Sequence, residues 1–176
     1  TNGNTNGIGT NALFNSPIGL CLSLDQSYLL ISDYNSNMIR KLDISTSSVS
    51  LLAGFTSSGN LNGIGTNARF NIPRGINISP DGTYALVVEE GNKVIRRITI
   101  STSSVTTIAG RTTSGKSNGI GSNAQFNNPN GISISPDGSY ALIADNNNHQ
   151  IREIILSTLM VSISGGRVSS GSTNGV

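Results

Sequence analysis

The stretch GRTTSGKS, residues 110–117, has the residue types and spacing of a phosphate-binding loop. Such a loop needs glycines that let backbone N–H groups turn toward the phosphates, a lysine, a hydroxyl for Mg²⁺, and a helix that starts directly afterwards. The segment that follows, from Asn118 to Gly131, is rich in glycine and asparagine and contains a proline, which disfavours a helix. The sequence therefore predicts a solvated loop here and no nucleotide site.

An internal repeat explains how this motif arose. The chain repeats with a period of 56 residues, so that Gly7, Gly63 and Gly119 align without any insertion between copies. In this alignment GRTTSGKS corresponds to GFTSSGNL at 54–61 and to GRVSSGST at 166–173. The phosphate-loop match is thus one variant of a Ser/Gly-rich turn that the chain builds three times.

Two other apparent chemical signals also belong to the repeat. The dinucleotide-loop pattern G-x-G-x-x-A occurs three times, twice as GIGTNA and once as GIGSNA, whereas a cofactor site would occur once. His149 is the only histidine, and Asn37 and Lys93 replace it in the other units, which favours a loop-packing role over metal binding or catalysis. We therefore expect no catalytic residue, no cofactor and no metal.

Composition narrows the class of partner. Charged residues make up 11% of the 176 residues, well below the ~25% typical of soluble domains, and Asn, Ser and Thr supply most of the polarity. This composition favours an extracellular or cell-surface protein. The net charge is +2 with both signs interleaved, so we expect no nucleic-acid partner. Without a long apolar run or a lipidation motif, we expect no membrane insertion.

Each unit contains four short apolar runs separated by turn signals. In the third unit we predict strands at 131–135, 140–145, 149–156 and 161–164, with Pro-Asp-Gly as the first turn. Four short antiparallel strands followed by a longer Gly/Asn/Ser-rich connection are typical of a propeller blade. The predicted fold is all-β, a β-propeller of four-stranded antiparallel blades at approximately 17–54, 73–110 and 129–166.

A recurring arginine in the third strand is the charged group that we expect inside the blades. Period-2 alternation places it on the more apolar face, where an unpaired charge would be strongly destabilising. Carboxylates recur at the end of the second strand and are the natural partners. We predict three structural ion pairs that join the arginines Arg40, Arg96 and Arg152 to the carboxylates Asp33, Glu89 and Asp145.

Motif segments that recur in this order resemble the NHL repeat. They are G-x-G-T-N-A-R-F-N-x-P-x-G-I, D-G-x-Y-A-L-x-x-D, N-H-x-I-R and V-T-T-I-A-G. The resemblance covers essentially all of residues 1–176 and implies a segment of a propeller that usually has six blades. Two departures stand out: the Asn-His pair occurs only as Asn148-His149, and Leu24-Asp25-Gln26 replaces Pro-Asp-Gly in the first unit.

Three blades are not expected to be stable alone, because a blade is apolar on both faces. An uncovered face with on the order of eight apolar side chains, at roughly 1.5–3 kcal/mol each, would forfeit about 10–20 kcal/mol, against a whole-domain stability of roughly 5–15 kcal/mol. The chain is therefore predicted to be half of a six-bladed ring or a window on a longer array. Further blades of the same chain, or other copies of it, would complete the structure.

Three functional hypotheses remain open. The favoured one is a non-enzymatic NHL-like propeller that acts as a protein- or glycan-interaction or structural module. A catalytic site needs different residues from different blades, whereas these three units are nearly identical. The alternative is an axis-site enzyme, like the lactonases and lyases that the resemblance implies, although the innermost strands offer no carboxylate there. A second alternative, an RNA-binding NHL domain, is disfavoured by an aromatic content of only 5%.

Overall fold

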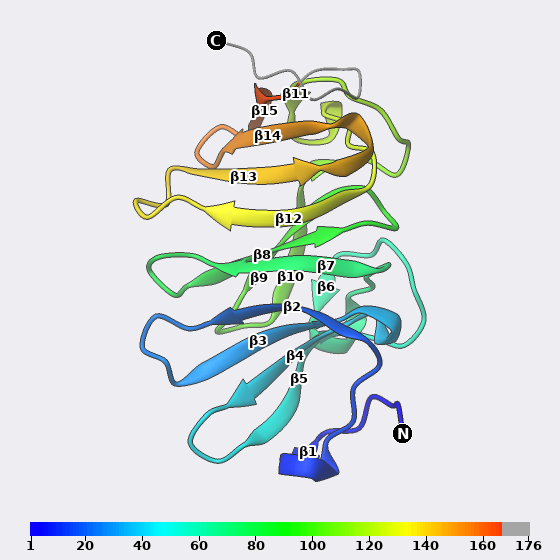
Figure 1. Cartoon of the computed structure of the whole chain (residues 1–176), viewed down its shortest axis with the longest axis vertical. Helices are drawn as coiled ribbons and strands as arrows, with labels where there is room; N and C mark the ends of the chain where they lie inside the picture. The colour runs from blue at the N-terminus through cyan, green and yellow to red at the C-terminus, as the bar shows by residue number, and fades with distance from the viewer. Residues whose placement is uncertain (167–176) are drawn as a thin grey trace.

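The computed structural model describes residues 1–166 as three antiparallel sheets, one for each 56-residue unit (Figure 1). The end of the predicted 1–176 segment, with most of the third Ser/Gly-rich loop, lies outside the described residues. The first blade contains β1 (Gly7–Ile8), β2 (Pro17–Leu22), β3 (Tyr28–Asp33), β4 (Met38–Asp43) and β5 (Ser48–Gly54). The second contains β6 (Gly63–Ile64), β7 (Pro73–Ile78), β8 (Tyr84–Glu89), β9 (Val94–Thr99) and β10 (Ser104–Gly110). The third contains β11 (Gly119–Ile120), β12 (Pro129–Ile134), β13 (Tyr140–Asp145), β14 (Gln150–Ile155) and β15 (Met160–Gly165).

Each blade has five strands, one more than the four predicted from the sequence. The additional strand is the Gly-Ile pair of the connecting segment, which lies at the outer edge of its own sheet, so that Gly119 pairs with Val161 and Ile120 with Met160 in the third blade. Two residues are too short to show an alternating pattern, so no strand could be predicted there from the sequence. The pairing partly covers the backbone groups of an otherwise open sheet edge.

The remaining regular elements are single 3₁₀ turns. Three of them follow the Gly-Ile strands: η1 (Gly9–Asn11), η3 (Gly65–Asn67) and η4 (Gly121–Asn123). Two others, η2 (Tyr34–Ser36) and η5 (Asn146–Asn148), lie between the second and third strands of β2–β5 and β12–β15. The segment GRTTSGKS thus leads into a two-residue strand and one 3₁₀ turn. Among the described residues no helix is long and apolar enough to cross a bilayer.

Aspartate turns close the inner hairpin of every blade. In the second blade the Asp81 carboxylate accepts hydrogen bonds from Ser79 Oγ at 2.6 Å and from the Thr83 N–H at 3.0 Å, while Gly82 takes a φ of 70°. Asp25 and Asp137 make the same contacts in the other blades. These hydrogen bonds lower the pKa of Asp137 to about 2, with the Ser135 hydroxyl as the largest cause. The three turns form one side of the molecule, which we call the hairpin rim.

The blades stack face to face, with β2, β7 and β12 side by side (Figure 1). Successive side chains of β8 point to opposite faces of the sheet. Val87 therefore lies in the core between the first two blades, whereas Leu86 and Val88 lie in the core between the second and third. The second blade is therefore apolar on both faces, as expected for a sheet covered on both sides.

The segment that connects two blades inserts between them. We call residues 11–15, 67–71 and 123–127, with the sequence Asn-Ala-x-Phe-Asn, the hooks of the three units. Phe70 and Phe126 are fully buried in the two blade junctions. Phe126 lies over Gly110, where a Cβ would come within 3.0 Å of the ring. Each hook thus fixes the blade that follows it to the blade before it.

Close approach of the innermost strands requires glycine. A Cβ at Gly75 of β7 would lie 2.6 Å from the backbone carbonyl oxygen of Asn130 in β12, and Gly19 of β2 faces the carbonyl of Arg74 in β7 in the same way. Because the obstructing atoms are backbone, they cannot turn aside. These glycines set the distance between neighbouring blades.

We expect Gly75→Ala to lower the free energy of unfolding by about 1–3 kcal/mol, the usual range for overpacking a close contact. Gly165→Ala is the matched control, because no described residue lies within 4 Å of a Cβ at that position. Urea unfolding followed by circular dichroism measures both. Equal stability of the two variants would contradict the proposed role of the glycine in blade spacing.

Candidate functional site

The structure places each predicted arginine beside its predicted carboxylate within the same blade. Nη1 of the arginine lies 3.3 Å from the carboxylate in the first blade, 2.6 Å in the second and 3.1 Å in the third, for the pairs Arg40–Asp33, Arg96–Glu89 and Arg152–Asp145. All six side chains are fully buried. The carboxylates end the second long strand and the arginines lie inside the third, so one β-hairpin positions both partners.

Each arginine also binds the connecting segment of its own unit. In the second blade Arg96 Nη1 donates to the Arg69 carbonyl at 3.1 Å, and Nη2 donates to the Leu61 carbonyl at 2.8 Å and to Asn62 Oδ1 at 3.0 Å. The guanidinium carbon also lies 5.3 Å from the centre of the Phe70 ring. The same contacts recur in the other units, with Asn6 and Asn118 in place of Asn62. Sequence reasoning missed these asparagines, although their recurrence before Gly-Ile was a usable signal.

The carboxylate of Glu89 is enclosed by donors. It accepts hydrogen bonds at 2.6 Å from the Asn71 N–H, from Asn92 Nδ2 and from Arg96 Nη1. Burial is the largest influence and raises the pKa of Glu89 to about 7, while Arg96, Asn71 and Asn92 act in the opposite direction. Burial likewise raises the pKa of Asp33. These groups are shielded from solvent and bonded to the hook, so their arrangement suits a structural role better than chemistry on a substrate. We call each buried arginine and its carboxylate partner a clamp.

The position of His149 requires a backbone conformation rather than an imidazole. His149 ends η5 with a φ of 55°, and Asn37 and Lys93 take φ values of 55° and 58° at the equivalent positions. The His149 side chain is exposed. Its neighbour Asn148 makes the buried contacts, since its Nδ2 donates to the Gly115 carbonyl and to Asp145 Oδ2, both at 2.7 Å. The asparagine of the Asn-His pair therefore links the loop, the clamp and the connecting segment.

Polar side chains of the innermost strands join neighbouring blades. Asn77 Oδ1 accepts a hydrogen bond from the Ile134 N–H at 2.8 Å, and Cys21 Sγ accepts one from the Ile78 N–H at 3.3 Å. These side chains are thus used in blade-to-blade contacts. In residues 1–166 no three His, Cys, Asp or Glu side chains are grouped so that they could hold a metal ion.

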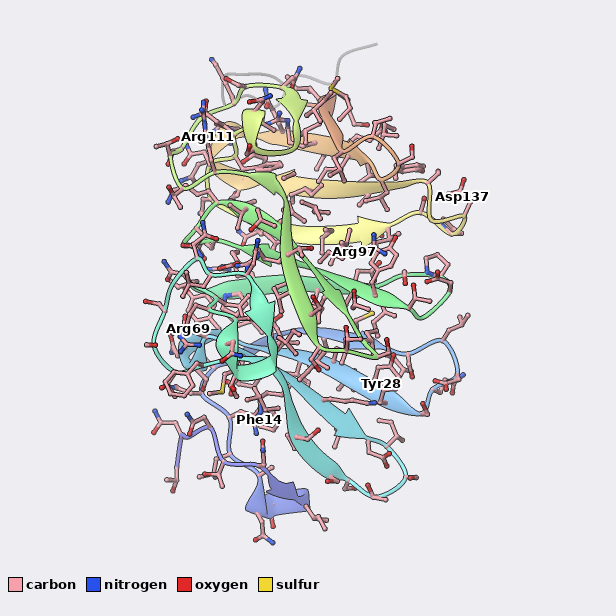
Figure 2. All side chains as sticks on the ribbon, turned by 180° about the vertical axis from the view of Figure 1, so that it is seen from behind. Phe14, Tyr28, Arg69, Arg97, Arg111 and Asp137 are labelled. Carbon is pink, nitrogen blue, oxygen red and sulfur yellow. The ribbon has the colours of Figure 1, made fainter. Side chains whose placement is uncertain are left out.

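The hairpin rim carries a groove of about 520 Å³ between the turns of the first two blades. Figure 2 shows this side of the molecule with Tyr28 and Asp137, whereas Arg69 and Arg111 lie on the opposite side. The groove is lined by Ser23, Leu24, Asp25, Tyr28, Pro80, Asp81 and Gly82. It therefore combines apolar surface with two carboxylates.

The departure of the first unit from the repeat explains where this groove lies. Between the second and third blades, Pro80 packs toward the next turn, and a Cβ at Gly138 would lie 3.7 Å from the Pro80 ring. The equivalent residue of the first unit is Leu24, and nothing lies within 4 Å of a Cβ at Gly82 opposite it. The Leu24 residue is 79% exposed. Replacement of proline by leucine thus leaves the junction open on this rim.

A second groove lies on the opposite rim, between the second and third blades. It measures about 350 Å³ and is lined by Ile72, Glu90, Gly91, Lys93, Asn127, Asn128 and Asn147. The Glu90 carboxylate is held there by an ion pair with Arg74, whose guanidinium also lies 5.2 Å from the centre of the Tyr34 ring. This groove is lined mainly by amides and charges and offers little apolar surface.

Arg96→Met is expected to lower the free energy of unfolding by about 3–5 kcal/mol at pH 8, because it leaves the buried Glu89 carboxylate without its cation. Adding Glu89→Gln should recover part of the loss, since the second change removes the uncompensated charge. Urea denaturation of both single variants and the double variant gives the coupling energy. Strictly additive losses would show that the two side chains do not act as a pair.

The raised pKa of Glu89 has a defined effect on stability. The folded protein holds a proton on this group up to about pH 7, whereas its ordinary pKa is 4.5, so folding takes up a proton between these values. The free energy of unfolding should therefore fall as pH rises from about 4.5 to about 7. Glu89→Gln should remove this dependence.

Asp137→Asn is the control for that titration, because the folded pKa of Asp137 is about 2 and its stabilising contribution is lost only in more acidic solution. Urea midpoints at a series of pH values provide the measurement. The assignment is wrong if Glu89→Gln and the unmodified chain have parallel profiles across the window.

No protein-family model matches the chain. The chain is 32% identical to NHL repeat-containing protein 2 of Bos taurus over 162 residues, which cover 85% of this chain and 22% of that protein. It therefore spans about a fifth of the length of this curated relative.

Two solved structures share the fold. One is an auxiliary nutrient binding protein from Bacteroides thetaiotaomicron, with a TM-score of 0.69 and 24% identity over 83% of this chain and 37% of the other. A chain of the nidogen/laminin complex has a TM-score of 0.65 and 12% identity over 86% of this chain and 49% of the other. Given its repeated motifs, its stacked blades and its similarity to an NHL-repeat protein, the chain belongs to the NHL-repeat β-propeller family.

Proposed function

We propose that this chain is a non-enzymatic protein-interaction module that binds a partner segment in the groove of the hairpin rim. The observation that carries the proposal is the open junction at Leu24, which sets this part of the rim apart from the equivalent junction at Pro80. The repeated buried charges are bonded within the blades, so we place the binding site at a feature that differs between blades, the rim around Leu24.

The groove fits a segment that presents an apolar side chain next to a basic one. Leu24, Tyr28 and Pro80 offer apolar surface, and a few convergent polar groups on such a surface are typical of a binding site. Asp25 and Asp81 flank it, and hydrogen bonds from Ser23 and Ser79 lower the pKa of these carboxyl groups, which keeps them charged at neutral pH. The side chains thus favour a cationic partner over a nucleic acid.

The comparisons and the composition support this proposal. Two of the structural neighbours are an auxiliary nutrient binding protein and a chain of the nidogen/laminin complex, and a binding role for this chain agrees with them by analogy of fold. The low charge and the Asn/Ser/Thr-rich composition favour a place in an extracellular or cell-surface assembly. Labelling of intact producing cells with a membrane-impermeant amine reagent tests the location.

Selection of random displayed peptides on the immobilised chain tests the proposed function. We expect enrichment of peptides with an apolar residue beside Lys or Arg, and a loss of at least about tenfold in their affinity in Leu24→Ser. Ile64→Ser is the matched control, because Ile64 is a similarly exposed apolar residue outside the groove. Affinities come from fluorescence anisotropy.

Three results would contradict the proposal: no enriched peptide, equal losses in the two variants, or binding that appears only on a glycan array. A salt-dependent gel shift with single-stranded RNA would instead favour a nucleic-acid-binding propeller.

A further inference from the structure

One face of the first blade is exposed, although the equivalent face of the second blade is buried. Leu20 and Leu22 of β2 are 61% and 48% exposed, whereas Ile76 and Ile78, their equivalents in β7, are 5% and 8% exposed in the junction with the first blade. The hook shows the same difference, because Phe14 is only partly buried while Phe70 and Phe126 are fully buried. Figure 2 shows Phe14 toward the free end of the stack.

The third blade exposes its other face, the one that corresponds to the face of the second blade buried against the third. Ile151 of β14 is 42% exposed, whereas its equivalent Ile95 is fully buried against the third blade. Gly166, whose φ of 89° resembles the 87° of Gly110 beneath Phe126, forms the equivalent socket, and no described residue places a ring over it. Gln150 beside this socket is only 4% exposed, and its amide N and O have no hydrogen-bond partner within residues 1–166.

Gly131 shows most directly that the third blade is built to receive a neighbour. At the equivalent Gly75 a Cβ would meet the Asn130 carbonyl of the next blade at 2.6 Å, whereas at Gly131 the nearest atom is Ala144 Cβ at 3.8 Å. Within this structure neither a positive φ nor a close contact requires glycine at position 131. The Ser133 hydroxyl likewise forms no hydrogen bond within residues 1–166, whereas its equivalents Cys21 and Asn77 accept N–H groups from the following blade.

We propose that a second copy of this chain docks head to tail, with its first blade against the third blade of the first copy. The two free faces are the two halves of a junction that the chain already builds twice, between its first and second and its second and third blades. By repeat equivalence, the second copy's Ile18 carbonyl would lie against Gly131 and its Leu22 N–H would donate to Ser133. Its Phe14 would enter the socket over Gly166.

This junction is expected to be weaker than the two internal ones. Ser164 and Gly165 occupy the positions where the second blade has Ile108 and Ala109, both buried against the next hook. The lost apolar contact makes the association reversible and dependent on concentration. Because the contact is heterologous, each copy retains one face for a further partner unless the copies close on themselves.

Sedimentation velocity of the 176-residue chain over a concentration series tests the proposal. We expect a mass that rises with concentration beyond that of one chain. Gly131→Ala should weaken association at least about tenfold by obstructing the third-blade face. Leu20→Glu should do the same by placing a charge on the first-blade face, and both substituted side chains lie outside the two internal junctions. Circular dichroism checks that fold.

Gly165→Ala is the matched control, because it adds a Cβ where the other two blades already carry alanine, at Ala53 and Ala109. It should preserve or strengthen association. The decisive test mixes the Gly131→Ala and Leu20→Glu chains, each of which retains one intact face. The mixture should form dimers at concentrations at which neither variant associates measurably alone. A monomer at every concentration, variants that associate like the original chain, or a mixture that stays monomeric would each overturn the proposal.

Discussion

The structure depends on apolar contact between the faces of neighbouring blades. A five-stranded sheet of this size cannot bury its own side chains, so alternate residues of one strand, such as Val87 and Val88, belong to different junctions. Hydrophobic stabilisation is therefore a property of pairs of blades rather than of single ones. The innermost glycines are part of this constraint, because a side chain at Gly75 would separate the blades.

The buried arginines make this contact specific. Each guanidinium is neutralised by a carboxylate of its own blade and at the same time holds two carbonyl groups and an asparagine of the connecting segment. The hook is thereby fixed in the position from which its phenylalanine enters the junction. A buried ion pair is rarely a large net source of stability, but leaving one of its members alone is costly. The arrangement accordingly specifies where the connection lies more than it adds stability.

Function is expected where the repeat is broken. The exchange of the Pro-Asp-Gly turn for Leu24-Asp25-Gln26 alters neither the aspartate hydrogen bonds nor the hairpin, yet it opens a groove between two blades. In the same way, Ser164 and Gly165 preserve β15 while changing the face that the third blade presents. Identical scaffolding with local substitutions lets the chain vary its surfaces without disturbing the junctions on which its stability depends.

The features that depend on neighbours along the chain could be predicted from the sequence. The run YALIAD coincides with β13, and the arginine and carboxylate of each clamp are seven residues apart on consecutive antiparallel strands, within reach of local reasoning. Four features became visible only in the folded chain: the fifth strand, the contact of Asn62 with Arg96, the open groove at Leu24 and the unoccupied space at Gly131. These features join residues tens of positions apart, and their geometry follows from the distance and angle at which whole blades pack, which no short sequence pattern encodes.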